Sequence, residues 1–101
     1  MGKRLALQSK LEELLGSRNV YEQPPESVKL KYPCIIYSKN SIDTKYADNK
    51  KYIMKDRYEI IVIDRSPDNP VIDKLMELQY CGYDRHYNSD NLSHDVFTLY
   101  Y

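Results

Sequence analysis

The stretch KYIMKDRYEIIVID, residues 51–64, decides the fold, because its second half carries apolar side chains on both faces of an extended chain. In a strand, Ile60 and Val62 face one way, whereas Ile61 and Ile63 face the other. A strand with apolar residues on both faces belongs in the middle of a sheet. We therefore expect residues 51–64 to form a central strand around which the other elements are arranged.

Toward the amino end, the leucine spacing predicts an amphipathic helix. Leu7, Leu11 and Leu14 recur at intervals of four and three residues, as one face of a helix requires. Gly16 follows the last of these leucines and is well suited to end a helix. We expect a helix over residues 3–15.

Between this helix and the central strand, the pattern predicts two further strands and one polar excursion. Residues 18–23 favour a short strand, and residues 31–38 favour a longer one with a proline near its start. Residues 39–50 are polar and have no clear period, so we expect a long loop or the tip of a hairpin. An excursion of this length often has a function of its own.

A second, shorter helix is expected after the central strand. The run Ser66-Pro-Asp-Asn-Pro70 is typical of a helix start, with Pro70 at the first helical position. Ile72, Leu75 and Met76 would then form the buried face of a helix that ends near Leu78.

The carboxyl end predicts a β-hairpin. Two tyrosine-rich segments, residues 80–87 and 92–101, flank the turn-forming tetrad of residues 88–91. With two helices and mostly adjacent strands, the predicted fold class is α+β, with a mostly antiparallel sheet, both helices packed on one side and a C-terminal β-hairpin. The length of 101 residues fits a single domain spanning residues 1–101.

Composition indicates a domain that assembles with something. Lys plus Arg and Asp plus Glu are 15 each, so the net charge is zero, which argues against a strongly basic duplex-DNA binder. Eleven tyrosines against one phenylalanine and no tryptophan favour subunit interfaces, since tyrosine buries a ring while its hydroxyl stays wet. No apolar run resembles a signal peptide or a membrane span, and we expect a cytoplasmic place of synthesis.

Catalytic, cofactor and metal sites are not predicted. His86 and His94, which we expect to be near cross-strand neighbours, do not complete a ligand set of recognised spacing, so a small metal-dependent hydrolase is a distant third interpretation. Cys34 and Cys81 lack a CxxC partner and are expected to be reduced, buried and inert. We therefore expect no cofactor, no metal and no enzymatic activity.

The lysines and tyrosines of residues 37–58 support a second interpretation, a small nucleic-acid-binding regulator. Aromatic rings between cations can stack single-stranded bases. Acidic residues dilute this charge, and a solvated hairpin explains the pattern better. The residues that we predict for a subunit or partner interface are Tyr46, Asp48, Asn49, Tyr52, Tyr83, Arg85 and Tyr87.

Three stretches resemble a known family. They are YPCIIY at residues 32–37, YADNKKY at residues 46–52 and RYEIIVIDRSPD at residues 57–68, and the ending YDRHYNSDNLSHDVFTLYY at residues 83–101 strengthens the likeness. Over residues 30–101 the chain is similar to the tail-terminator, or tail-completion, proteins at the head–tail joint of long-tailed phages and prophages of Gram-positive bacteria.

The resemblance implies a structural virion protein without chemistry. Members of that family form a hexameric ring that caps the finished tail tube and then joins it to the connector of the filled head. DNA passes through the lumen without sequence-specific binding, and no membrane is involved. The expected partners are thus the chain itself, the tail tube protein and the head connector or stopper, with assembly in the host cytoplasm. A head-closure stopper of the same neck region is the alternative within this class.

Overall fold

The computed structural model describes residues 2–24, 27, 29–47 and 50–101. Within these residues the chain forms two helices and one five-stranded sheet of order β1-β2-β3-β5-β4. The elements are α1 (Gly2–Leu15), β1 (Val20–Glu22), β2 (Cys34–Ala47), β3 (Lys50–Asp64), α2 (Val71–Met76), β4 (Cys81–Ser89) and β5 (Leu92–Tyr100). β1 runs parallel to β2, and all other neighbours are antiparallel. The predicted fold class is confirmed.

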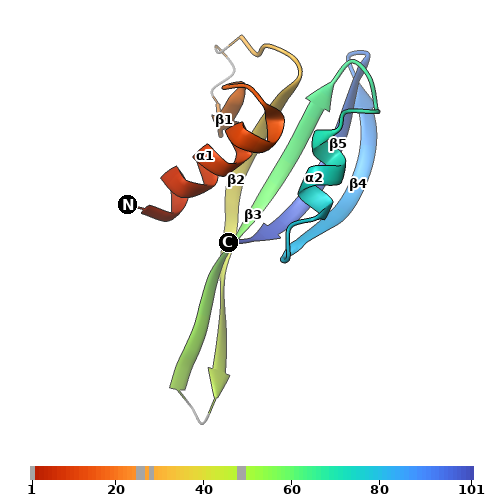
Figure 1. Cartoon of the computed structure of the whole chain (residues 1–101). Helices are drawn as coiled ribbons and strands as arrows, with labels where there is room; N and C mark the ends of the chain where they lie inside the picture. The colour runs from red at the N-terminus through yellow and green to blue at the C-terminus, as the bar shows by residue number, and fades with distance from the viewer. Residues whose placement is uncertain (1, 25–26, 28, 48–49) are drawn as a thin grey trace.

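Both helices pack on one face of the sheet (Figure 1). Leu7 and Leu11 of α1 and Val71 and Leu75 of α2 are at most 2 % exposed, because these positions face the sheet. The sheet side chains that complete this core are Val20, Ile35, Tyr37, Tyr58, Ile60, Val62, Phe97 and Leu99. As predicted, β3 is the central strand.

The ends of α1 and of the hairpin follow from local backbone chemistry. Gly16 has φ of 80° and its N–H donates to the Glu12 carbonyl oxygen at 2.9 Å, which closes α1 where the sequence predicts. The hairpin turns at Asp90 and Asn91, whose φ values of 54° and 63° are those of a two-residue turn. The predicted hairpin is therefore confirmed, with a turn two residues tighter than expected.

α2 differs from its prediction in which side chains it buries. Its buried residues are Val71 and Leu75, one helical turn apart, whereas Met76 is 47 % exposed. The helix ends at Met76 rather than near Leu78. Pro70 stands at the N-cap, and the Asn69 side chain accepts a hydrogen bond from the Val71 N–H at 2.9 Å. The helix therefore buries Val71 and Leu75 and leaves Met76 exposed, because a helix of six residues turns only one narrow face toward the sheet.

Of the two alternatives expected for residues 39–50, the hairpin tip is confirmed and the long loop is wrong for the described residues of that segment. Paired strands continue out to Ala47 opposite Lys50, with register shifts between Lys39 and Ser41 and between Lys45 and Tyr46. Strand pairing uses backbone groups and needs no apolar residues, so a two-stranded ribbon with no core to face leaves no period in the sequence. We call this ribbon, residues 39–57, the arm.

The arm extends away from both helices and from the hairpin (Figure 1). β5 pairs with β3 only from Arg57 onward, and β1 pairs with β2 only around Ile35 to Tyr37. In the described part of the chain no third strand joins the outer ladder. The molecule is therefore elongated, with extents of 50 × 24 × 22 Å.

Candidate functional site

The β4–β5 hairpin presents two chemically different faces, and a β-bulge in β4 sets which residue lies on which. Tyr83 lies opposite Phe97, but Arg85 lies opposite Val96, so Asp84 is an extra residue in the ladder. Tyr83 consequently shares the helix-covered side with the core residue Phe97. Arg85 lies on the other side, beside Val96.

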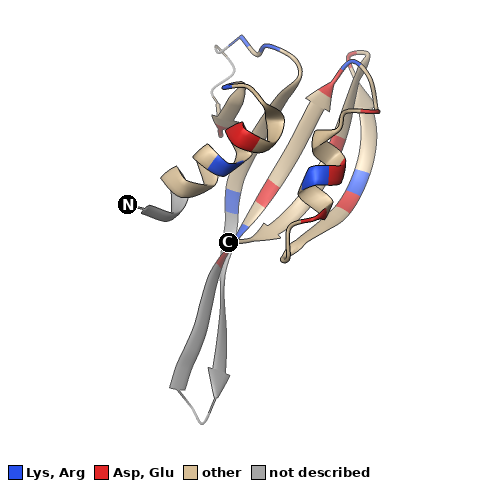
Figure 2. Ribbon diagram, viewed as in Figure 1, with Lys and Arg blue, Asp and Glu red and all other residues tan. Residues whose placement is uncertain are grey.

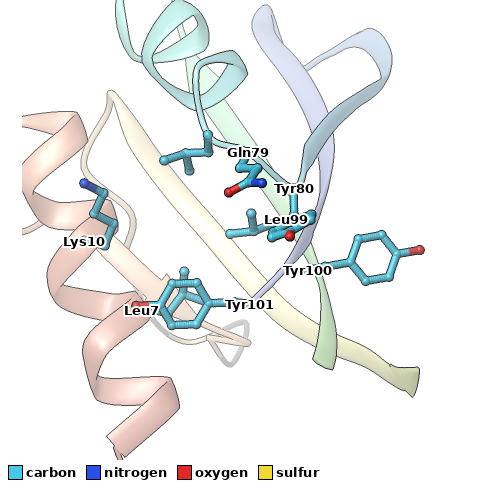
Figure 3. A pocket seen from close by; sticks show the side chains of 8 residues that line it. Leu7, Lys10, Gln79, Tyr80, Leu99, Tyr100 and Tyr101 are labelled. Atoms are coloured by element: carbon cyan, nitrogen blue, oxygen red, sulfur yellow. The ribbon is translucent and has the colours of Figure 1, made fainter. Parts of the chain in front are cut away.

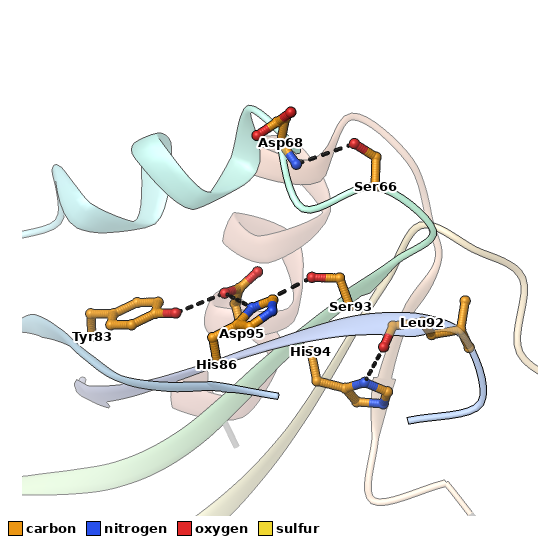
Figure 4. Close-up of polar contacts among 8 residues, drawn as sticks. All are labelled: Ser66, Asp68, Tyr83, His86, Leu92, Ser93, His94 and Asp95. Carbon is orange, nitrogen blue, oxygen red and sulfur yellow. Dashed lines mark hydrogen bonds and ion pairs between the residues drawn. The ribbon is translucent and has the colours of Figure 1, made fainter. Parts of the chain in front are cut away.

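A buried carboxylate organises the helix-facing side of the hairpin (Figure 4). Asp95 is 6 % exposed, and its Oδ1 accepts a hydrogen bond from the Tyr83 hydroxyl at 2.8 Å. The His86 Nδ1 lies 2.8 Å from the same oxygen, which assigns the proton to this nitrogen as the donor. The Ser93 Oγ is 3.5 Å from the same His86 nitrogen. We call these four residues the Asp95 cluster.

The Asp95 cluster holds a buried carboxylate by hydrogen bonds that form within the hairpin. Desolvation, followed by the hydrogen bond to Asp95 and the negative charge of Asp95, raises the pKa of the Tyr83 hydroxyl. Tyr83 also packs edge-on against Phe97, with ring centroids 5.3 Å apart. Among the described residues no group of three His, Cys, Asp or Glu could hold a metal ion.

The two histidines are not cross-strand neighbours, contrary to the sequence expectation. Because the turn comprises only Asp90 and Asn91, His86 pairs with Asp95 and His94 pairs with Tyr87. Consecutive positions of a strand face opposite sides, so the two imidazoles lie on opposite faces of the sheet.

The other face of the sheet is not covered by either helix. Its centre is a cross-strand row formed by Ile36, Ile61, Val96 and Arg85. Val96 is 0 % exposed within this row, since its neighbours and their longer side chains surround it. We call this side the open face.

Beside that row, Tyr87 stacks on His94 with ring centroids 4.7 Å apart and an interplanar angle of 16°. The Arg85 guanidinium lies 5.8 Å from the Tyr87 ring centroid and 2.8 Å from an Asp84 carboxylate oxygen. Tyr87 nevertheless remains 38 % exposed. The open face therefore exposes an aromatic and cationic group, Tyr87, His94 and Arg85, beside the half-buried Ile36 and Ile61, and aromatic residues and arginine are enriched at protein interfaces.

The two thiols are poor nucleophiles near neutral pH. Burial, with the Asp64 charge as a smaller cause, raises the pKa of Cys34 to about 11. Burial alone raises the pKa of Cys81 to about 11. Both are free cysteines, and a protonated thiol neither attacks substrates nor binds metals efficiently.

A shallow groove of about 380 Å³ separates α1 from the carboxyl end of β5 (Figure 3). Tyr101 lies across it against Leu7, and Lys10 stands at its α1 side. The remaining lining residues are Leu78, Gln79, Tyr80, Leu99 and Tyr100. Lys10 is the cation among these residues, and the walls are mostly apolar.

The predicted interface residues are distributed over three places. Tyr46 and Tyr52 belong to the strands of the arm, whereas residues 48 and 49 (Asp48 and Asn49) lie outside the described residues. Tyr83 belongs to the Asp95 cluster. Arg85 and Tyr87 belong to the open face.

Sequence reasoning missed the Asp95 cluster and the continuation of β2 through residues 39–47. The residues before Asp95 are the polar Ser93 and His94, so the local sequence does not mark this carboxylate as buried. Nor does a sequence signal mark the strand pairing of residues 39–47.

In the described part of the chain, no helix is long and apolar enough to cross a membrane. Comparison of the chain with protein-family models, with curated protein sequences and with solved structures finds no match.

Proposed function

We propose that this protein is a structural subunit of the head–tail joint of a long-tailed phage or prophage, of the tail-terminator kind. In this role several copies form a ring that caps the tail tube and joins it to the head connector, with DNA passing through the lumen. The choice of this family is based on the resemblance of residues 30–101 to tail-terminator proteins. The observation on the molecule that carries the proposal is the arm, residues 39–57.

The arm favours assembly because an isolated two-stranded ribbon is marginally stable in water. Its outer ladder gains no third strand among the described residues, and it extends far from the helices (Figure 1). A partner that packs against the arm would bury surface that the single chain leaves open. On the open face, Tyr87 is 38 % exposed and Ile36 and Ile61 are partly exposed, so a partner packed there would bury further apolar area.

The described chemistry also suits a structural role. The Asp95 cluster is satisfied within the hairpin, and the pKa values of both thiols are raised. A conduit for DNA needs no strong attraction to phosphate, and a net charge of zero is compatible with that.

The experiment is to measure the mass of the purified protein by light scattering over a concentration series, with and without purified tail tubes. We expect a ring of six 12.0 kDa chains, free or on the tube, visible as a cap at tube ends by electron microscopy. A chain that stays monomeric and leaves the tube ends bare overturns the proposal.

A matched variant identifies the contribution of the arm. Replacing residues 44–54 with Asn-Gly joins the register partners Asp43 and Lys55 by a two-residue turn. We expect this variant to keep the stability of the monomer to within about 1 kcal/mol, because the removed segment lies beyond the part of the ladder that β1 and β5 join. It should lose ring formation. A variant that assembles normally shows that the arm is not needed for assembly.

A further inference from the structure

The zero net charge of the chain conceals a strong separation of charge along it. The arm, residues 39–57, contains six Lys or Arg and three Asp or Glu, a net charge of +3. Residues 58–101 contain three Lys or Arg and eight Asp or Glu, a net charge of −5. Residues 1–38 contribute the remaining +2, from six basic and four acidic residues.

Figure 2 shows several acidic residues on α2 and its flanking segments, where Asp64, Asp68, Asp73 and Glu77 outnumber Arg65 and Lys74, whereas Asp84 and Arg85 of β4 form an ion pair. Asp73 and Glu77, one helical turn apart, are both exposed. Such a like-charged pair is destabilising unless a cation approaches it. The intervening Lys74 reaches elsewhere, since its Nζ lies 3.5 Å from the Leu14 carbonyl oxygen.

Exposed apolar side chains accompany these carboxylates. Met76, Tyr80 and Tyr83 are between 46 % and 49 % exposed, and they are three of the five most exposed large apolar side chains among the described residues. They belong to α2, to the link after it and to β4, elements that contact one another. We call Asp73, Met76, Glu77, Tyr80 and Tyr83 the α2–β4 surface. It combines apolar area with negative charge.

We propose that the arm of one copy docks on the α2–β4 surface of a second copy of this chain. The arm carries a net charge of +3 and the α2–β4 surface carries Asp73 and Glu77, so the two are complementary in charge. The arm extends away from the α2–β4 surface of its own chain (Figure 1), so the contact is between copies.

This contact joins two different regions of the chain and is therefore heterologous. Heterologous contacts generate rings when the rotation closes and filaments when it does not. The inference thus rests on the proposed function, and it adds which surface receives the arm.

Two charge-reversed variants test the contact. The arm variant carries Lys45→Glu and Lys51→Glu, whose register partners are Ile53 and Tyr46, so no carboxylate lies opposite either change. The surface variant carries Asp73→Lys and Glu77→Lys. A control, Lys29→Glu with Lys31→Glu, reverses two exposed lysines outside both regions.

The measurement is light scattering over a concentration series at about 50 mM and about 500 mM salt, where exposed charges are screened strongly at the higher value. We expect each variant alone to weaken association by about ten-fold, as several lost or reversed surface ion pairs predict. An equimolar mixture should restore association to nearly the wild-type value, because each arm then meets a surface of opposite charge. The control should associate as the wild type does.

If the surface variant loses its fold by circular dichroism, Asp73→Asn with Glu77→Gln takes its place, and a weaker loss of association is expected. If the arm variant associates as strongly as the wild type does, the docking contact is overturned, but ring assembly is not. If the wild type stays monomeric at every concentration, the contact is also overturned. The proposed function is then tested separately, by whether the protein caps tail tubes. Salt-sensitive retention of the wild type on single-stranded DNA, lost in the arm variant without a change of mass, would identify nucleic acid as the occupant and overturn the contact.

Discussion

The two halves of β3 lie in different environments although they form one continuous strand. From Arg57 to Asp64 the strand has β2 on one side and β5 on the other, and Ile60 and Val62 are at most 1 % exposed. From Lys50 to Lys55 it pairs with β2 alone. The difference teaches that hydrogen-bonded pairing extends a strand, whereas burial of apolar side chains is what anchors it.

The largest expected effect comes from one isoleucine in each half. Ile60→Ala removes a fully buried side chain from the core and should lower the free energy of unfolding by about 3 kcal/mol. Ile53→Ala, in the arm, should lower it by less than about 1 kcal/mol, since β3 pairs there with β2 alone. The midpoint and slope of urea unfolding measure both changes. Equal losses would contradict the comparison and show that the arm belongs to the folded core.

A smaller effect is expected from breaking the polar contacts of one carboxylate in each region, Asp95 in the hairpin and Asp56 at the base of the arm. Asp95→Ala leaves the Tyr83 hydroxyl and the His86 imidazole without their acceptor and should cost about 2 kcal/mol. At the base of the arm, Lys39 lies 3.6 Å from Asp56 with about half of its side chain exposed. Lys39→Ala should therefore cost less than about 0.5 kcal/mol.

Thermal or urea unfolding of both variants tests this pair. Tyr83→Phe, which removes only one of the two hydrogen bonds to Asp95, should give an intermediate loss of about 1 kcal/mol. An Asp95→Ala variant as stable as the wild type would mean that the cluster does not hold the hairpin.

The smallest effect is a pH dependence of stability that comes from Cys34, which pairs with Ile63 in the buried half of β3. Burial raises the pKa of Cys34 to about 11 from an ordinary value of 9.0, so the folded chain holds this proton more tightly than the unfolded chain does. The free energy of unfolding should therefore fall as the pH rises from about 8 through 11, by about 0.4 kcal/mol at pH 9 for this thiol. In the Cys34→Ala variant the decline between pH 8 and pH 10 should be shallower. An unchanged slope would show that the Cys34 thiol does not contribute.

Much of the fold could be predicted from sequence because its signals are local. The leucine spacing of residues 3–15 predicts α1, and Gly16 ends it. The two-sided apolar run of residues 57–64 predicts a central strand. The turn-forming residues at 88–91 predict the hairpin. In each case the side chains that face the core are also those that recur with the period of the element.

The candidate site could be predicted only in part, because its geometry depends on register. Tyr83, Arg85 and Tyr87 were predicted together, yet the extra residue Asp84 puts Tyr83 on the side opposite to the other two. A single bulge or a turn tighter by two residues changes every cross-strand pair, and neither leaves a pattern in the sequence. With the turn at Asp90 and Asn91, His86 pairs with Asp95 and His94 pairs with Tyr87, so the two histidines lie on opposite faces.

The sequence by itself determined the α+β class, the central strand, the first helix and the C-terminal hairpin, since each depends on short-range periodicity and turn chemistry. Only the tertiary structure decided that the polar residues 39–47 continue β2, that Asp95 is buried between Tyr83 and His86, and that one face of the sheet stays open. These features depend on which strands become neighbours and in which register. That choice is made by the summed burial of the whole chain, and no window of sequence contains it.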